Sequence, residues 1–269
     1  SRCMYRACRV RSNTASCMEL HMKYIHRAQR ASLHTAIPLL LATGSLGLMA
    51  ILWRRRSAPR AEEQLRDRHW NQFTGTSAPP SGEGTQAADD GTGVLVHRRY
   101  EVSLPDRAMS RDIVMRLMQL HLTELAPAAL ANFEKSEGLD SVFRVDDEYE
   151  ITMLGPWNGK VRVTEMLPDS FTLVTLEGHP EAGHITFSVD DDVEQPGNLR
   201  ARIESWARAR DSLVEVAYGT LGIGKQVQTE VWVTFLQRLS VLAGVTTRPE
   251  VHITTENIPQ SADGEDRDA

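Results

Sequence analysis

The sequence predicts an α+β domain in which a curved antiparallel sheet wraps around a long C-terminal helix, preceded by a single transmembrane helix. Three observations support this. Residues 36–53 contain no charged side chain. Between residues 94 and 210, apolar and polar residues alternate in short stretches that turn-forming residues separate, a pattern typical of antiparallel strands. Residues 211–242 then carry apolar side chains at helical spacing.

Charge is divided unevenly along the chain. The net charge is -6, with 41% hydrophobic and 25% charged residues. Residues 1–60 hold eleven Lys or Arg and one acid, whereas the remaining residues hold nineteen basic and thirty-five acidic ones. A basic head on an acidic body favours targeting or membrane attachment and argues against nucleic-acid binding by the folded part. All three cysteines lie in the head, so the body has no disulfide, thiol catalyst or cysteine-based zinc site.

The basic N-terminal part of the chain predicts a targeting sequence followed by a membrane anchor. Residues 1–35 form a basic tail that resembles a mitochondrial transit peptide, with a disordered tail as the alternative. Residues 36–53 are long enough to span a bilayer at about 1.5 Å per residue, and Trp53 with Arg54, Arg55 and Arg56 follows as an interfacial stop.

Nearby positive charge predicts the orientation of this anchor. Six arginines follow the apolar segment within fifteen residues, and three basic residues precede it within the same distance. The six are Arg54, Arg55, Arg56, Arg60, Arg66 and Arg68, and the three are Lys23, Arg27 and Arg30. We therefore expect a single-pass membrane protein whose soluble domain faces the cytosol or the mitochondrial matrix.

Composition also predicts where the domain ends. Residues 57–93 are expected to form a disordered linker, because Gly, Ser, Thr, Pro and acidic residues leave almost no apolar content after residue 74. Residues 246–269 are acidic and are expected to form a disordered tail apart from a short strand at 251–254. The globular domain is therefore expected at residues 94–245.

The first half of the domain is expected to contain two strands and a helix. Residues 94–104 alternate and predict a strand. Ser110 is placed to cap a helix that Pro127 ends, and residues 128–136 are expected to add one or two helical turns. Residues 143–153 alternate again, with Asp147 on the apolar side. A local bulge that turns Asp147 outward is favoured there over a cavity that it lines.

Hairpins dominate the second half. Residues 155–163 and 169–176 are expected to pair around a turn that Pro168 and Asp169 begin. Residues 184–190 and 199–208 form the next two strands. The acidic stretch between them is interpreted as a solvated hairpin tip, with a calcium loop as the alternative.

The last element is a helix over residues 211–242, weakened at three glycines. One side of this helix is expected to be an apolar stripe of Val227, Val231, Phe235, Leu239 and Leu242, broadened by Trp232 and Leu236. The opposite side is expected to face water and carries Gln226, Gln228, Glu230, Gln237 and Arg238. An antiparallel sheet curved around a long final helix is the helix-grip arrangement of START-like and polyketide-cyclase-like proteins. The small inner residues Ala201, Ser205 and Ala207 would leave space for a ligand between the two layers.

Two stretches carry a more specific resemblance. Residues 175–188 contain T-L-x-G-H-x-x-A-G-x-x-x-F-S, and residues 203–208 contain I-x-S-x-A-R ahead of the final helix. From about residue 94 to 245, and most strongly after 155, the chain resembles the family called domain of unknown function nineteen-ninety. That family implies no settled activity, so no catalytic residue is carried over.

Five side chains are candidates for ligand contact, namely Asp147, Trp157, His179, Glu181 and Trp206. His179 and His184 bracket Glu181, but a turn held by its own hydrogen bonds is favoured over a metal site, because the spacing is not a zinc signature. His179 as a polar pocket group is an intermediate interpretation. Trp157 belongs to a turn that could cover a pocket mouth, and Trp206 contacts a ligand only if the outer sheet face turns inward.

No motif for catalysis, cofactors or metals is present at a specific spacing, and the sequence does not indicate protein partners. The favoured function is a membrane-anchored domain that binds a hydrophobic small molecule or lipid. One alternative is a cyclase- or hydrolase-type enzyme that uses His179 with Glu181 or Asp147. The other is a scaffold with a filled core and no ligand.

Overall fold

The computed structural model describes residues 59–65, 82–105, 109–139, 142–153, 158–212 and 223–258. All of them belong to the unit Arg55–Ala269. The expected basic tail and the expected membrane helix at 36–53 lie outside the described residues. Among the helices that are described, none has the length and apolar content needed to cross a bilayer.

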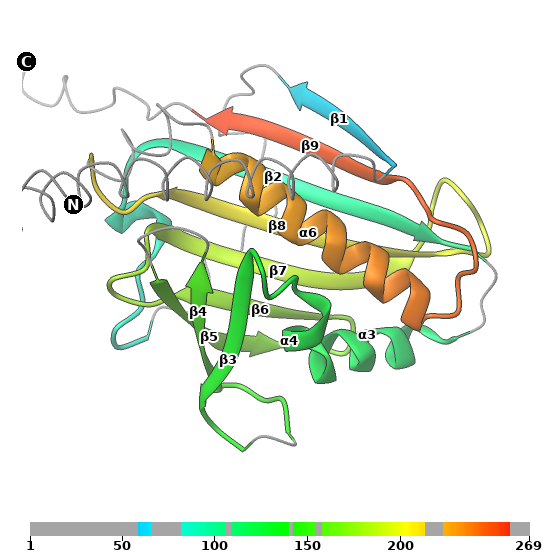
Figure 1. Cartoon of the computed structure of the whole chain (residues 1–269), viewed down its shortest axis with the longest axis horizontal. Helices are drawn as coiled ribbons and strands as arrows, with labels where there is room; N and C mark the ends of the chain where they lie inside the picture. Colours follow the sequence, from blue (N-terminus) through cyan, green and yellow to red (C-terminus); the bar gives the residue numbers. More distant parts are fainter. Residues whose placement is uncertain are drawn as a thin grey trace, which may run out of the picture. The chain divides into compact units, whose positions relative to one another are not determined.

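Nine strands of the described chain form one sheet. They are β1 Arg60–Leu65, β2 Thr92–Leu104, β3 Ala131–Glu137, β4 Glu148–Met153, β5 Asn158–Met166, β6 Ser170–Thr175, β7 Glu181–Asp191, β8 Leu199–Ala209 and β9 Val251–Ile258. Their order across the sheet is β1-β9-β2-β8-β7-β6-β5-β4-β3 (Figure 1). Strands β3 to β8 pair in sequence as antiparallel neighbours, and β2 returns to pair with β8 on one side and β9 on the other. The edge strand β1 runs parallel to β9.

Helix α6 (Ile223–Leu242) lies across one face of this sheet, and the short helices α3 (Arg111–Leu120) and α4 (Leu122–Leu125) lie beside its C-terminal turns (Figure 1). This is the α+β helix-grip arrangement that the order of elements predicts. The expected hairpins at β5–β6 and β7–β8 are confirmed, with the acidic turn at the tip of the second.

Aromatic rings fill the middle of the interior. Phe171 and Phe187 stack with their centroids 4.7 Å apart, and Phe187 lies 5.6 Å from Trp232 and 5.5 Å from Phe235 of α6. Burying a side chain of this size contributes about 1.5–3 kcal/mol. Ala201 is fully buried as well. Large rings from β6, β7 and α6 thus pack against one another between the sheet and the helix.

Helix α6 is covered on more sides than its pattern predicts. Glu230, expected in water, is 4% exposed and its Oε1 lies 2.7 Å from Arg60 Nη1 of β1. Gln237 is also buried, whereas Leu242 of the expected apolar stripe is 42% exposed. The reason is that strands β1 and β9 and helix α4 cover sides of α6 that a two-layer arrangement would leave open.

In the middle of the chain, the structure differs from two of the expected elements. Residues 131–137, expected to be helical, form β3, because Ala131 and Phe133 both turn into the core and the strand pairs with β4. The strand expected from residue 143 begins only at Glu148. Asp146 adopts a positive φ of 71°, which makes a turn where the alternating pattern predicts a strand.

The sheet extends beyond residues 94–245 at both ends. Strand β1 forms within the expected linker, and Gln86 inserts between β6 and β7, where its N–H donates to Thr175 O and its carbonyl accepts from Gly183 N. In the expected tail, the short strand becomes β9 and runs to Ile258, with Val251 and Ile258 buried. These segments contain too few apolar residues to be recognised alone, and hydrogen bonding to neighbouring strands stabilises them: β1 to β9, Gln86 to β6 and β7, and β9 to β2.

Candidate functional site

Polar side chains gather on the inner face of the sheet at the end where α6 begins. The start of β2, the start of β7, the end of β8 and the first turns of α6 meet there. In the middle of the interior, Tyr100, Phe187 and Phe235 have 0% exposure. At this end the inward-facing Glu181 and the α6 residue Gln228 stay partly exposed. Inner side chains at this end are therefore less completely buried than those in the middle.

Arg98 is the central cation of this cluster. It shares the inner face of β2 with Tyr100 and Val102, and it is 8% exposed. Its Nη1 donates to Gln228 Oε1 of α6 at 3.0 Å and to the Tyr100 hydroxyl at 3.3 Å. The guanidinium thus connects the sheet to the first turns of the helix, where its charge is largely shielded from water.

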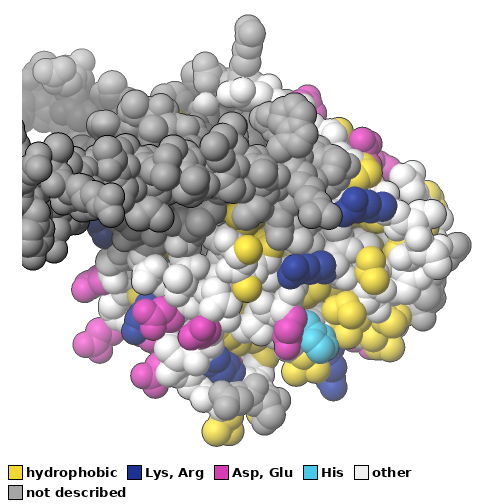
Figure 2. Space-filling model, viewed as in Figure 1, with side chains coloured by type: hydrophobic (Ala, Val, Ile, Leu, Met, Phe, Trp, Pro, Cys, Tyr) yellow, Lys and Arg dark blue, Asp and Glu magenta, His cyan; other side chains and the backbone are white. Residues whose placement is uncertain are grey.

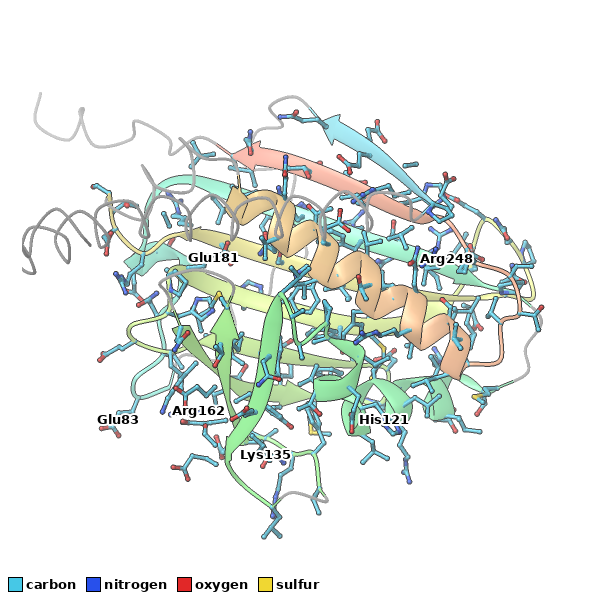
Figure 3. All side chains as sticks on the ribbon, viewed as in Figure 1. Glu83, His121, Lys135, Arg162, Glu181 and Arg248 are labelled. Carbon is cyan, nitrogen blue, oxygen red and sulfur yellow. The ribbon has the colours of Figure 1, made fainter. Side chains whose placement is uncertain are left out.

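Glu181 is the matching acid. It begins β7 on the inner face, near α6 (Figure 3), and Gln228 Nε2 donates to its Oε2 at 3.2 Å. Burial raises the pKa of Glu181, and the nearby charge of Arg98 offsets this only in part. The Gln228 amide consequently bridges the two charged groups, with its oxygen toward Arg98 and its nitrogen toward Glu181. Burial likewise raises the pKa of Tyr100.

His179 lies in the loop that precedes Glu181. Its Nδ1 is 2.9 Å from the carbonyl oxygen and 3.0 Å from the backbone nitrogen of Glu181, so the ring is held by its own turn. Gln86 Nε2 donates to the His179 carbonyl at 3.1 Å. Burial lowers the pKa of His179 to about 4, which keeps the ring neutral at pH 7. The ring also fills the position where Gly159 of β5 lacks a side chain.

The five expected contact residues separate into different places. Glu181 belongs to this cluster, and the His179 ring holds the backbone of Glu181 without contacting the other members. Asp147 lies just before β4, three strands away from β7 in the sheet order, where it is buried and accepts from Lys135 Nζ at 2.6 Å. The favoured outward bulge at Asp147 is therefore wrong, because the carboxylate turns inward to pair with Lys135. Trp157 lies outside the described residues.

Trp206 occupies the outer face of the sheet, so it does not meet the inner cluster. Its ring stacks on His97 with centroids 3.7 Å apart. His97 Nε2 is 2.7 Å from Glu204 Oε1, and His97 Nδ1 is 3.3 Å from Glu256 Oε2. Burial alone would raise the pKa of Glu204, but hydrogen bonds from His97 and Arg99 lower it to about 2. These contacts on the outer face join β8, β2 and β9, and they give Trp206 a structural role.

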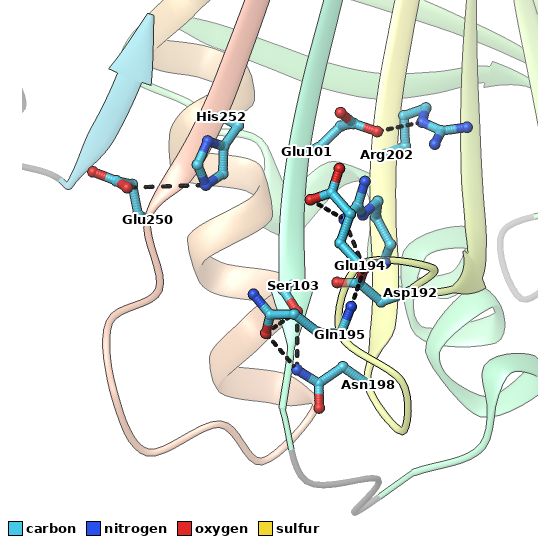
Figure 4. A network of polar contacts seen from close by, with 10 residues as sticks. Glu101, Ser103, Asp192, Glu194, Gln195, Asn198, Arg202, Glu250 and His252 are labelled. Atoms are coloured by element: carbon cyan, nitrogen blue, oxygen red, sulfur yellow. Dashed lines mark hydrogen bonds and ion pairs between the residues drawn. The ribbon is translucent and has the colours of Figure 1, made fainter.

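Neither metal alternative matches the geometry. His184 faces the outer side of β7 near Glu204, whereas Glu181 faces the inner side, so the two cannot share one ion. In the acidic turn, Asp192 Oδ1 accepts from Arg200 at 2.6 Å and from the N–H groups of Glu194 and Gln195, which closes the turn (Figure 4). Within the described ranges, no three His, Cys, Asp or Glu side chains group as metal ligands.

Arg98, Tyr100 and Gln228 are members of the cluster that sequence analysis missed. The sequence did contain a signal for Arg98, because it is a charged residue in an otherwise apolar series of alternating strand positions. Asp147 was singled out for the same reason. Gln228 gave no such signal, because a glutamine on a helix is expected in water.

Residues 134–238 match the family model described as Domain of unknown function (DUF1990). The chain carries a DUF1990 domain. The matched DUF1990 segment includes His179, Glu181 and Gln228, whereas Arg98, Tyr100 and strand β9 lie outside it. None of the curated proteins matches the sequence.

Solved structures similar to the DUF1990 chain include norcoclaurine synthase from Thalictrum flavum in complex with dopamine and hydroxybenzaldehyde, at 15% identity over 64% of this chain and 99% of that one, with a TM-score of 0.39. A conserved protein from Geobacillus kaustophilus shares 14% identity over 58% and 99%, with a TM-score of 0.38. Major latex-like protein 151 from Panax ginseng shares 16% over 52% and 96%, with a TM-score of 0.33.

Proposed function

We propose that the DUF1990 domain binds a hydrophobic small molecule whose polar group contacts Arg98, Tyr100, Glu181 and Gln228. One observation carries this proposal: a guanidinium and a carboxyl lie between sheet and helix, at the end where inner side chains remain accessible. Such sites are typically apolar with a few convergent polar groups that orient the ligand.

The energetic cost of the cluster supports a functional role. Removing a charged group from water costs several kcal/mol, and a packed apolar pair at the same positions would often be as stable or more so. Buried ionisable groups with shifted pKa values are frequent at functional sites. Arg98 and Glu181 are thus better explained by recognition of a ligand than by stability alone.

The decisive experiment compares two adjacent arginines. Arg98 faces inward, whereas its neighbour Arg99 faces outward and donates to Glu204 at 2.9 Å. The full chain and its Arg98→Met and Arg99→Met variants are purified from cells, and bound small molecules are extracted and identified by mass spectrometry. We expect wild type and Arg99→Met to retain a hydrophobic compound, and Arg98→Met to lose at least about tenfold, the equivalent of one charge-assisted hydrogen bond.

Two results would overturn the proposal. If folded wild-type protein yields no bound compound, the scaffold alternative stands. If Arg98→Met and Arg99→Met retain equal amounts, the bound compound does not contact this cluster.

A cyclase- or hydrolase-type enzyme is the second candidate, favoured by the raised pKa of Glu181. A carboxyl that keeps its proton to higher pH can act as a general acid. Asp147 does not support the pairing with His179, because its carboxylate is engaged by Lys135 beside β4 while His179 is held by the backbone of Glu181. Conversion of the extracted compound by wild type, lost in Glu181→Gln while the compound stays bound, would favour this candidate over simple binding.

We also propose, from the apolar sequence of residues 36–53, that the domain is anchored to a membrane by a single span. The test is fractionation of cells that express the full chain, with alkaline carbonate washing of the membranes. We expect the chain to remain in the washed pellet, and its release with the soluble proteins would contradict the anchor.

A further inference from the structure

A second candidate site lies at the other end of α6, away from the Arg98 cluster. A groove of about 650 Å³ runs between the last turns of α6, helix α4 and residues 245–249. Ligand pockets typically measure about 300–1,000 Å³, so the groove can hold one small molecule. His121 and Arg248, which both line it, lie on either side of the last turns of α6 (Figure 3).

The walls of the groove are apolar, and several are unusually exposed for residues of their type. Val241 and Leu242 are 69% and 42% exposed, and the partly exposed Val245 and Pro249 continue the apolar surface. Hydrophobic side chains gather beside Lys and Arg side chains on this face of the molecule (Figure 2). An exposed apolar surface with a charged rim is typical of a binding site.

The rim of the groove is cationic on an otherwise acidic body. Arg238 Nη1 donates to the carbonyl oxygens of Glu124 at 2.7 Å and Ala126 at 2.8 Å, which fixes the guanidinium without neutralising it. Arg248 makes no ion pair with any described residue. The acid on the rim, Glu124, has its Oε2 3.6 Å from His121 Nδ1. The groove therefore complements a negative charge.

A buried amide adds an independent observation. Gln237 lines the groove and is 8% exposed, and its Nε2 has no hydrogen-bond partner among the residues that the structure describes. A buried polar group without a partner costs about 1–3 kcal/mol, so a ligand that supplies an acceptor would recover that cost.

We propose that this groove binds a monomeric anionic amphiphile, with its carboxylate near Arg238, Arg248 and Gln237 and its apolar chain along Val241, Leu242 and Val245. The apolar walls match the chain, and the unpaired guanidiniums match the head. A concave groove closed by α4, α6 and a loop suits a single molecule better than a flat bilayer. This site is separate from the one proposed at Arg98.

The test uses dodecanoate below its micellar concentration, dodecanol as the neutral molecule of equal chain length, and vesicles that contain phosphatidylglycerol. Binding to the full chain is measured by calorimetry for wild type, Arg248→Gln and Val241→Ser. Arg248 is chosen over Arg238, because Arg238 also holds the end of α4. Arg116→Gln is the matched control, since Arg116 is an exposed α3 residue outside the groove.

We expect wild type to bind dodecanoate more tightly than dodecanol and Arg248→Gln to weaken dodecanoate about tenfold. Val241→Ser should weaken both ligands, and Arg116→Gln should change neither by more than about twofold. An equal loss in Arg116→Gln would overturn the proposal, as would binding to vesicles without binding of the monomer. If Arg98→Met abolishes dodecanoate binding and Arg248→Gln does not, the groove proposal fails while the inner site stands.

Discussion

At the scale of single residues, burial disfavours the protonated form of two histidines. Burial lowers the pKa of His179 and of His184 to about 4, from 6.5 in an unfolded chain. Below pH 6.5 these histidines bind protons in the unfolded chain but stay neutral in the folded chain. The free energy of unfolding therefore falls as pH drops from 6.5 to 4. The loop motif that suggested a metal site therefore predicts a dependence of stability on pH instead.

His179→Gln is expected to flatten this dependence. Because burial lowers the pKa of His179 from 6.5 to about 4, wild type should lose about 2 kcal/mol more than the variant between pH 7 and pH 5. Urea denaturation at the two pH values measures the difference. His252→Gln is the control, since the His252 side chain is 63% exposed and solvent surrounds it in both states. A variant slope equal to that of wild type would show that His179 is protonated in the folded protein.

Gly159 supplies a prediction about close contact. A Cβ at this position would lie 2.0 Å from His179 Cδ2, so Gly159→Ala forces the ring out of its place. We expect a loss of about 1–3 kcal/mol of unfolding free energy, as for other overpacked sites. Gly82→Ala is the control, because its added Cβ would meet only ordinary contacts at 3.6 Å and beyond.

A double-mutant cycle separates this clash from a general effect of alanine. In a His179→Ala background, Gly159→Ala should cost much less, because the ring is absent. Additive losses would contradict the contact.

At the scale of elements, strand β1 depends on a buried ion pair with α6. The Arg60 and Glu230 side chains are 11% and 5% exposed, and the pair joins the edge of the sheet to the helix. Strand β1 has the sequence RAEEQL, with little apolar surface of its own. Its position therefore rests on the ladder with β9 and on this pair, which sequence patterns could not reveal.

Arg60→Met should destabilise the protein by about 3–5 kcal/mol, because the Glu230 carboxylate is left buried without its partner. Hydrogen exchange is expected to show faster exchange of the β1 amides. Glu62→Gln is the control, since Glu62 lies 3.8 Å from Arg60 but is 63% exposed, and it should change stability by less than about 0.5 kcal/mol.

Replacing both partners tests the same idea in reverse. Arg60→Met with Glu230→Leu should recover most of the stability, because no charge is left buried. A double variant as unstable as Arg60→Met would show that the pair is not responsible.

At the scale of the whole molecule, the C-terminal strand β9 lies inside the sheet. It pairs with β1 on one side and β2 on the other, and Val251, Ile253 and Ile258 are at most 5% exposed. Glu256 also reaches His97 on the outer face. A chain that ends at residue 245, where composition placed the domain boundary, lacks all of these contacts.

Such a truncated chain should fail to fold. We expect it to be insoluble or to unfold without a cooperative transition, because β2 is left as an open edge. A chain that ends after Ile258 is the comparison and should unfold cooperatively in circular dichroism. Cooperative unfolding of the shorter chain at the wild-type midpoint would contradict a structural role for β9.

The sequence by itself determined the class of fold, most strands and the final helix, because these follow from the spacing of apolar residues along a continuous stretch. It also marked His179 and Glu181 as candidate contact residues, which stay a prediction. Only the tertiary structure decided that Arg98 meets Gln228, 130 positions later in the chain. It likewise decided that Trp206 faces outward, Asp147 pairs with Lys135, and β1 and β9 complete the sheet. The physical reason is that periodicity is local, whereas strand order and register bring together residues from distant parts of the chain.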